Sequence, residues 1–279
     1  MDRNICRSVA APGNGRNVWG IMRVIGFAYS LSPFFLMNNS QITSMCASLL
    51  VLAVGALSSF TAAQPLADRE TRTVGSFTEI SLGGSAHVVV KQGSPQSVVV
   101  EASKEDLADF ETEVQGNKLR LGYRQKPGSG MFNYKNHGPV TVYVTAPSLT
   151  ALRVGGSGKL EVDGMLQADA MTLAVSGSGD LLVPQLEAGR LETAVSGSGS
   201  ATVGGTCPRN DIRISGSGEV RAHDLKTETS RARISGSGDA HVFASRTAEG
   251  SISGSGGMYV AGGAQLSSRS SGSGRVVKE

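Results

Sequence analysis

A length of 279 residues allows one large domain or two ordinary ones, and an apolar content of 39% excludes a disordered chain. With 37 glycines, 5% aromatic residues and no Gly-X-Y period, the sequence fits neither a typical layered core nor collagen, and favours short strands joined by tight corners. The net charge of +3 comes from residues 1–63, because removing their four arginines and one aspartate from the totals of 26 and 23 leaves 22 basic and 22 acidic residues. The neutral remainder has no sequence-wide basic field to attract nucleic acid or anionic lipid, so no nucleic-acid partner is expected.

Residues 1–63 have the features of a leader segment. The uncharged apolar run 46–60 is followed by Thr61, Ala62 and Ala63, which place small residues at the −3 and −1 positions of a cleavage site before Gln64. This run is shorter than the ~20 apolar residues that span a membrane. We therefore expect an exported protein, periplasmic, on the outer surface or secreted, with no membrane span in its mature form.

The beginning of the leader has three alternatives. A second apolar patch, 18–37, is interrupted by Arg23 and Pro33. In the first alternative, translation starts internally, at Met22 or Met37. In the second, the leader is unusually long, and in the third, a membrane anchor is retained. The first alternative is favoured, because a long leader with two apolar patches is uncommon.

Residues 64–71 are predicted as a linker and 72–150 as an irregular β section that caps the fold, because exposed ends of repeat arrays need capping. The stretch 104–114 is compatible with a short helical turn, and 125–138 is rich in turn residues and predicts a loop. Alternating apolar and polar residues predict strands within 77–82, 87–90, 97–101, 118–121 and 140–144.

Residues 151–279 consist of a regular repeat, which is the strongest signal in the sequence. A Gly-Ser-Gly cassette recurs at spacings of 21, 20, 19, 20, 18 and 18 residues, and alternating strands precede and follow it. The central serines are Ser157, Ser178, Ser198, Ser217, Ser237, Ser255 and Ser273. A unit of this length is too short for a propeller blade or a helical repeat. It predicts an all-β fold, a parallel β-helix or β-solenoid with rungs of about 20 residues.

The cassettes are predicted to be the corners of the rungs. Glycine permits a positive φ angle at a corner and has no side chain to collide with the same corner of the next rung. We expect the seven serine hydroxyls to form a stacked ladder along the rod, each donating to the next.

The order of short motifs resembles the auto-transporter adhesin head GIN domain family of exported bacterial proteins, over about Arg72 to the C-terminus. The motifs are Phe77 to Ile80, Gly84 to Val90, Gln92-Gly93, Val100 to Ala102, Asp106-Leu107, Gly116 to Leu119, Pro147 to Leu149 and Gly156 to Gly158. The resemblance implies a parallel β-helix without a defined biochemical role. The chain ends at Val276 to Glu279 without the ~10-residue alternating strands of a membrane barrel, so we expect that it does not transport itself.

Patterns typical of catalysis or metal binding are incomplete. The glycine-rich stretch 155–159 lacks the first glycine and the Ser or Thr of a phosphate-binding loop. The residue after each cassette is acidic in three of seven copies, too few for a calcium ladder, and the four histidines are dispersed. Cys207, the one cysteine after residue 63, is expected to be a small buried hydrophobe. We expect no catalytic residues, no metal site and no cofactor.

One candidate binding site is a basic patch. Arg213, Arg221, Arg231 and Arg233 fall within two adjacent repeats, and Arg213 and Arg233 occupy equivalent positions that should stack. The alternative is a solvated face in which Glu219, Asp224 and Glu228 balance these charges. The patch is nevertheless the most specific site that the sequence offers.

Together these patterns predict an exported, non-catalytic binding or adhesion scaffold of the cell envelope. Its partner would be an envelope component, either a glycan or a protein surface, and the open edge of the last rung favours pairing into a homodimer. A carbohydrate-binding or carbohydrate-active β-helix is the alternative, since such proteins bind substrate along a lateral face.

Overall fold

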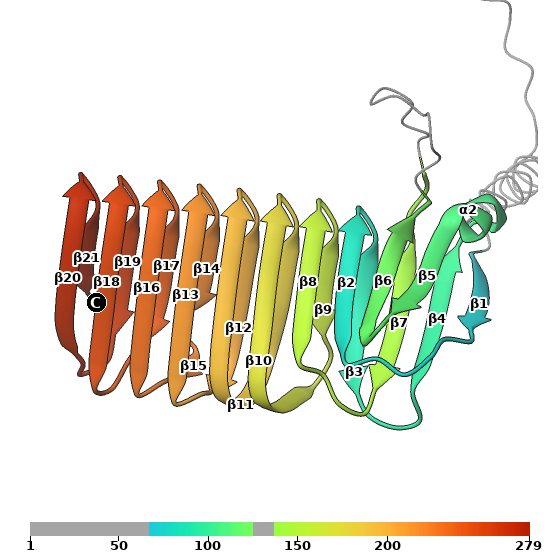
Figure 1. The fold of residues 1–279 in the computed structure, drawn as a ribbon, viewed down its shortest axis with the longest axis horizontal. Coiled ribbons are helices and arrows are strands. Elements are labelled where there is room, and N and C mark those ends of the chain that lie inside the picture. The colour runs from blue at the N-terminus through green and yellow to red at the C-terminus, as the bar shows by residue number, and fades with distance from the viewer. Residues whose placement is uncertain (1–66, 125–136) are drawn as a thin grey trace, which may run out of the picture. The chain divides into compact units, whose positions relative to one another are not determined.

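A computed structural model describes residues 67–124 and 137–279 (Figure 1). The predicted leader, its cleavage site and most of the predicted loop 125–138 lie outside the described residues. The described residues belong to one compact unit. Within the described ranges, no helix is long and apolar enough to cross a membrane.

Two sheets run along the molecule, joined at the Gly-Ser-Gly corners. The entry sheet contains the strands that lead into a corner: β2 (Glu79–Gly84), β8 (Ala151–Gly156), β10 (Met165–Gly177), β11 (Asp180–Gly197), β13 (Arg209–Gly216), β16 (Thr229–Gly236), β18 (Thr247–Gly254) and β20 (Gln265–Gly272). The exit sheet contains the first part of β11 and the strands that leave a corner: β3 (His87–Gln92), β9 (Lys159–Val162), β12 (Ser200–Thr206), β14 (Glu219–Ala222), β17 (Asp239–Phe243), β19 (Gly257–Ala261) and β21 (Arg275–Lys278). A short strand, β15 (Leu225–Lys226), pairs with β12.

Each strand pairs in parallel with the equivalent strand of the next repeat. Val175, Ser176 and Gly177 of β10 lie opposite Val195, Ser196 and Gly197 of β11, and the same register continues through β13, β16, β18 and β20. Figure 1 shows these strands side by side in one row. The predicted parallel β-solenoid is confirmed.

The core lies between the two sheets and is built from columns of aliphatic side chains. Because strand side chains alternate between faces, the same position points inward in successive rungs as far as β18, while its equivalent in the last rung, Ser270, is exposed. One such column, at most 2% exposed, is Leu82, Val154, Val175, Val195, Ile214, Ile234 and Ile252. Fully burying one aliphatic side chain contributes about 1.5–3 kcal/mol, so repetition along the rod supplies the core that the few aromatic residues do not. Cys207 is fully buried, as predicted.

The corners stack backbone to backbone. Gly177 has a φ of 116°, and a Cβ atom built on it would lie 2.5 Å from the carbonyl oxygen of Gly156 in the preceding rung. The second glycine of the same cassette, Gly179, is equally confined, with a Cβ position 2.5 Å from the carbonyl oxygen of Gly158. The backbone N–H of Ser178 donates to the Gly156 carbonyl at 2.9 Å. Both roles predicted for the corner glycines are therefore confirmed.

The N-terminal section contains antiparallel strands and the one helix among the described residues. Its elements are β1 (Asp68–Arg72), β4 (Ser97–Ala102), α2 (Lys104–Asp109), β5 (Phe110–Gln115), β6 (Lys118–Tyr123) and β7 (Thr141–Ala146). Strand β5 is antiparallel to β6, and β4 is antiparallel to both β7 and β1. This arrangement ends the parallel ladders, although a capping role for the section stays a prediction.

Two expectations for this section need correction. Residues 68–71 of the predicted linker belong to strand β1, because a charged sequence can form an exposed edge strand without an apolar alternation. Strands β2 and β3 are a regular rung rather than an irregular segment, and they lie between β6–β7 and β8–β9. Gly84, at the corner of this rung, has a φ of 98° and pairs with Gly156.

Replacing a corner glycine should destabilise the fold. Gly179→Ala is expected to lower the free energy of unfolding by about 1–3 kcal/mol, because the new methyl group would lie 2.5 Å from the Gly158 carbonyl oxygen and 2.6 Å from Cγ1 of the buried Val154. Urea unfolding followed by circular dichroism measures this change. Gly75→Ala is the control, since nothing lies within 4 Å of a Cβ there, and equal stability of both variants would contradict close stacking of the corners.

Candidate functional site

The seven predicted corner serines lie above one another, but their hydroxyl groups do not form a ladder. Ser157, Ser178, Ser198, Ser217, Ser237, Ser255 and Ser273 are all exposed. Successive corners are joined by backbone hydrogen bonds, such as Ser217 N–H to the Gly197 carbonyl at 2.9 Å. Among the described residues, no hydrogen bond joins one of these hydroxyls to the next. The expected chain of hydroxyl donors is therefore wrong, because the tight bend turns these side chains outward to solvent.

The structure brings together three of the four predicted arginines. Arg213 on β13 lies directly opposite Arg233 on β16, and Arg231 is in the neighbouring column of the same sheet. Arg221 is separate from them because it follows a corner and belongs to β14 of the exit sheet, where it forms an ion pair with Glu219. The predicted four-residue patch is therefore divided between two sheets.

The arginines of the entry sheet differ in their partners. Arg231 lies 2.8 Å from Glu249 and 3.8 Å from Asp211, and Arg190 lies 3.0 Å from Asp211. The hydrogen bond and charge of Arg231, with smaller effects of Arg233 and Arg269, hold the pKa of Glu249 below its ordinary value.

Arg213 and Arg233 are exposed and make no ion pair or hydrogen bond within the described part of the chain. Their carboxylate neighbours are already engaged with Arg190 and Arg231. The column that they share therefore carries two positive charges that no ion pair neutralises among the described residues, although Arg233 acts on Glu249 at longer range.

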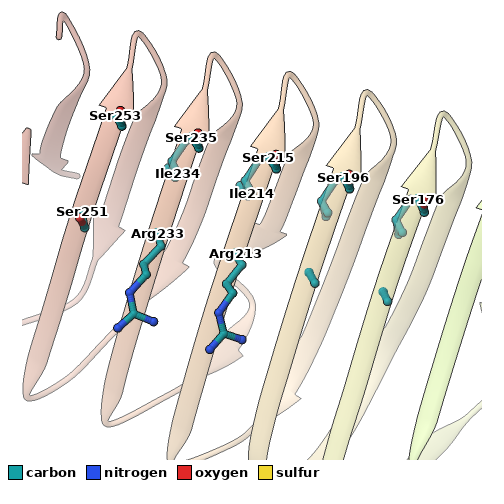
Figure 2. Close-up of a pocket in the computed structure, with 14 residues that line it drawn as sticks. Ser176, Ser196, Arg213, Ile214, Ser215, Arg233, Ile234, Ser235, Ser251 and Ser253 are labelled. Carbon is teal, nitrogen blue, oxygen red and sulfur yellow. The ribbon is translucent and has the colours of Figure 1, made fainter. Parts of the chain in front are cut away.

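A shallow groove of about 470 Å³ runs across β10, β11, β13, β16 and β18 beside this arginine pair (Figure 2). Its lining contains Ala174 and Ala194 in the same column as the arginines. The lining serines are those that immediately precede five of the Gly-Ser-Gly cassettes and one further serine on β18: Ser176, Ser196, Ser215, Ser235, Ser253 and Ser251. In Figure 2 the Arg213 and Arg233 side chains extend in the same direction from neighbouring strands. We call this feature the arginine groove.

A second hollow of about 250 Å³ lies on the same strands and was missed by sequence reasoning. It is lined by Arg190, Arg209, Asp211 and Arg231, together with Thr229 and the buried Asn210. Arg190 and Arg209 occupy equivalent positions of successive repeats, so aligning the repeats would have revealed them. The hollow therefore places further arginine side chains on the same sheet, at a greater distance from the corners.

A polar cluster at the N-terminal end is the other concentration of titratable groups. The buried Asp106 carboxylate lies 2.8 Å from His137 Nδ1 and accepts hydrogen bonds from the Ser103 hydroxyl at 2.8 Å and the Gly138 N–H at 3.0 Å. The His137 ring stacks on Tyr123 at 3.6 Å between centroids. The aspartate lies between the serine and the histidine, so the histidine does not contact the serine as a general base would.

The electrostatics of this cluster follow from burial and hydrogen bonding. Burial alone would raise the pKa of Asp106, but the hydrogen bonds from His137, Ser103 and Gly138 outweigh it and hold that pKa below its ordinary value. Burial, with the nearby charges of Asp106 and Asp109, raises the pKa of Tyr123 to about 12. The cluster thus holds α2 against the residues that follow position 136. Its geometry is that of a structural anchor.

The described residues contain no group of three or more His, Cys, Asp or Glu side chains that could hold a metal ion. The fold and the arginine groove define a class, a parallel β-solenoid repeat scaffold with a shallow groove on one lateral face.

A family model described as "Putative auto-transporter adhesin, head GIN domain" matches residues 76–264. The chain belongs to this family, whose description indicates a binding or adhesion role. A search of curated proteins finds no match.

Several solved structures share the fold. One from Parabacteroides distasonis ATCC 8503, described as a "putative lipid binding protein", is 22% identical, with a TM-score of 0.63 over 76% of this chain and 96% of the other. A "putative adhesin" from Bacteroides fragilis NCTC 9343 is 20% identical, with a TM-score of 0.68 over 78% and 100%. Another, from Parabacteroides merdae ATCC 43184, is 17% identical, with a TM-score of 0.60 over 76% and 95%. At these identities, the likeness establishes the solenoid fold.

Neutralising the buried carboxylate should destabilise the N-terminal end. Asp106→Asn is expected to lower the free energy of unfolding at pH 7 by about 1–3 kcal/mol, because a hydrogen-bonded carboxylate is lost. Since the folded-state pKa is depressed, the wild-type advantage is full above the unfolded pKa of about 3.9 and is lost as pH falls through the folded value.

Urea titrations between pH 7 and pH 3 measure this difference. Asp169→Asn, at an exposed position of β10, is the matched control and is expected to change stability by less than about 0.5 kcal/mol. Similar stability of the two variants at pH 7 would contradict the anchoring role of Asp106.

Proposed function

We propose that this protein is an exported, non-catalytic binding or adhesion scaffold of the cell envelope, and that the arginine groove is its contact surface. Family membership supports a binding or adhesion role. The leader-like features of residues 1–63 support export to the periplasm, the outer surface or the medium. A partner in that location is an envelope component, a glycan or a protein surface.

The observation that carries the proposal is that Arg213 and Arg233, which line the groove, form no ion pair within the described residues. Three other arginines of the entry sheet, Arg153, Arg190 and Arg231, form ion pairs with carboxylates, as in Arg153 with Glu79 at 2.5 Å. A pair of guanidinium groups without carboxylate partners is available for the bidentate hydrogen bonds that arginine makes with anionic groups. The rigid stacked strands hold both side chains at a constant spacing.

A non-catalytic role is supported by the composition of the groove. Its lining consists of alanine, valine, isoleucine, serine and arginine side chains, without the paired carboxylates or histidine of an acid–base mechanism. The buried Asp106 lies at the N-terminal end of the molecule and is already bonded to His137, Ser103 and Gly138.

The double variant Arg213→Gln, Arg233→Gln tests the contact surface. When cells produce the full chain, the wild-type protein is expected in the envelope fraction and the variant in smaller amount there, because it lacks the two unpaired cations. Quantitative immunoblotting of the cell fractions measures attachment in cells. The same blot, applied to envelope fractions and to lipid vesicles after mixing with purified protein, measures attachment in vitro.

The control is Arg69→Gln, Arg124→Gln, which removes the same charge from exposed arginines of the N-terminal section. Attachment of the control is expected to match the wild type. Unchanged attachment of the groove variant, or an exclusively cytoplasmic wild-type protein, would overturn the proposal.

A further inference from the structure

Two like charges held side by side on neighbouring strands are unfavourable for a sheet. Arg213 and Arg233 are such a pair, directly opposite each other and without a carboxylate within ion-pair distance in the described residues. Arg231, in the next column of the same sheet, is by contrast neutralised, because it lies between the carboxylates of Glu249 and Asp211. The energetic cost of the unpaired column is offset when an anionic ligand lies on it.

The column also indicates the direction of that ligand. It continues from Arg233 through Ser251 to Arg269. Along the rod axis, Arg213 and Arg233 are therefore one rung apart, and Arg233 and Arg269 are two rungs apart. In the other direction the column contains Ala194 and Ala174, whose small side chains leave the groove open. Five strands spaced about 4.8 Å apart give the groove a length of roughly 19 Å. A ligand that meets the whole column must be elongated and lie across the strands.

The chemistry of the walls favours a carbohydrate over other anionic polymers. The groove offers a serine hydroxyl on each of its five strands, from Ser176 to Ser253, and these match a chain of hydroxyl groups. Single-stranded nucleic acid requires aromatic side chains on which bases stack, and none lines the groove. An extended peptide recognised by strand addition needs the open edge of a sheet, whereas the groove lies on a sheet face.

We propose that the arginine groove binds a linear acidic polysaccharide that lies along the rod axis, with its carboxylate or sulfate groups on Arg213 and Arg233 and its hydroxyl groups on the serine row. This inference rests on the proposed function and specifies the ligand class. Carboxylated and sulfated chains share the same chemistry toward a guanidinium fork, and the probes below distinguish them.

The test uses the purified full chain and measures equilibrium binding by biolayer interferometry. The probes are polygalacturonate, chondroitin sulfate, neutral dextran, poly-glutamate and single-stranded DNA. Wild-type protein is expected to bind polygalacturonate or chondroitin sulfate, and to bind dextran, poly-glutamate and DNA at least about tenfold more weakly, because these lack either the charge or the matching hydroxyl groups.

Two variants examine the groove. Arg213→Gln, Arg233→Gln is expected to weaken polysaccharide binding about tenfold or more, from the loss of charge-assisted hydrogen bonds. Ala194→Glu supplies a carboxylate directly opposite Arg213 and fills the groove, so it should weaken binding to a similar extent without removing an arginine. Circular dichroism confirms that each variant is folded.

Arg69→Gln, Arg124→Gln again removes equal charge far from the groove and should bind like the wild type. A loss in this control equal to that of the groove variant would show non-specific attraction and overturn the inference. Equal or tighter binding of poly-glutamate or DNA would also overturn it. If no polysaccharide binds while envelope attachment still depends on Arg213 and Arg233, this inference fails and the proposed function stands; if attachment is independent of both arginines, the proposed function fails as well.

Discussion

The contact on which the whole structure depends is the approach of one Gly-Ser-Gly corner to the next. At Gly177 and Gly179 the space for a Cβ atom is already occupied by backbone of the preceding rung. Any other residue at either position would separate the corners and shift the strands on both sides. Because the corners fit without side chains, the entry and exit strands reach the parallel register in which the aliphatic columns form a continuous core.

The same register determines the surface. Because successive rungs repeat the same register, residues at one outward-facing position form a column along the rod. Where the residues of such a column are small, the surface has a groove. Ala174 and Ala194 leave such a space, while Arg213 and Arg233 stand in the same column. The binding face that we propose would require no loop or domain closure, because the backbone hydrogen bonds of the sheet already fix the spacing of the strands that carry its side chains.

Much of this architecture could be predicted from the sequence because its cause is local and repeated. The cassette spacing predicts the rungs, and the equivalent positions of Arg213 and Arg233 predict their juxtaposition. Arg221 was misplaced because sequence proximity was given more weight than its position after a corner. Strand β1 was not foreseen because Asp68 to Arg72 are almost all charged, and its pairing with β4 is a long-range contact that no local pattern encodes.

The place of the β2–β3 rung was also beyond local reasoning. Its corner contains Gly84 but ends in Ala86, so the repeat is not obvious, and β6–β7 stack outside it although they come later in the chain. Arg213 and Arg233 have no ion-pair partner because Asp211 and Glu249 lie in the neighbouring column, opposite Arg231. This arrangement can be deduced only from the register of three strands, β13, β16 and β18, taken together.

Distances between spin labels on the corner serines test the stacking most directly. Ser157→Cys is combined in turn with Ser217→Cys, Ser237→Cys, Ser255→Cys and Ser273→Cys, in a background without the native cysteines, and pulsed electron paramagnetic resonance measures each pair. The account predicts that the distance rises by about 4.8 Å for each additional rung. Distances that do not increase steadily with rung number would contradict it.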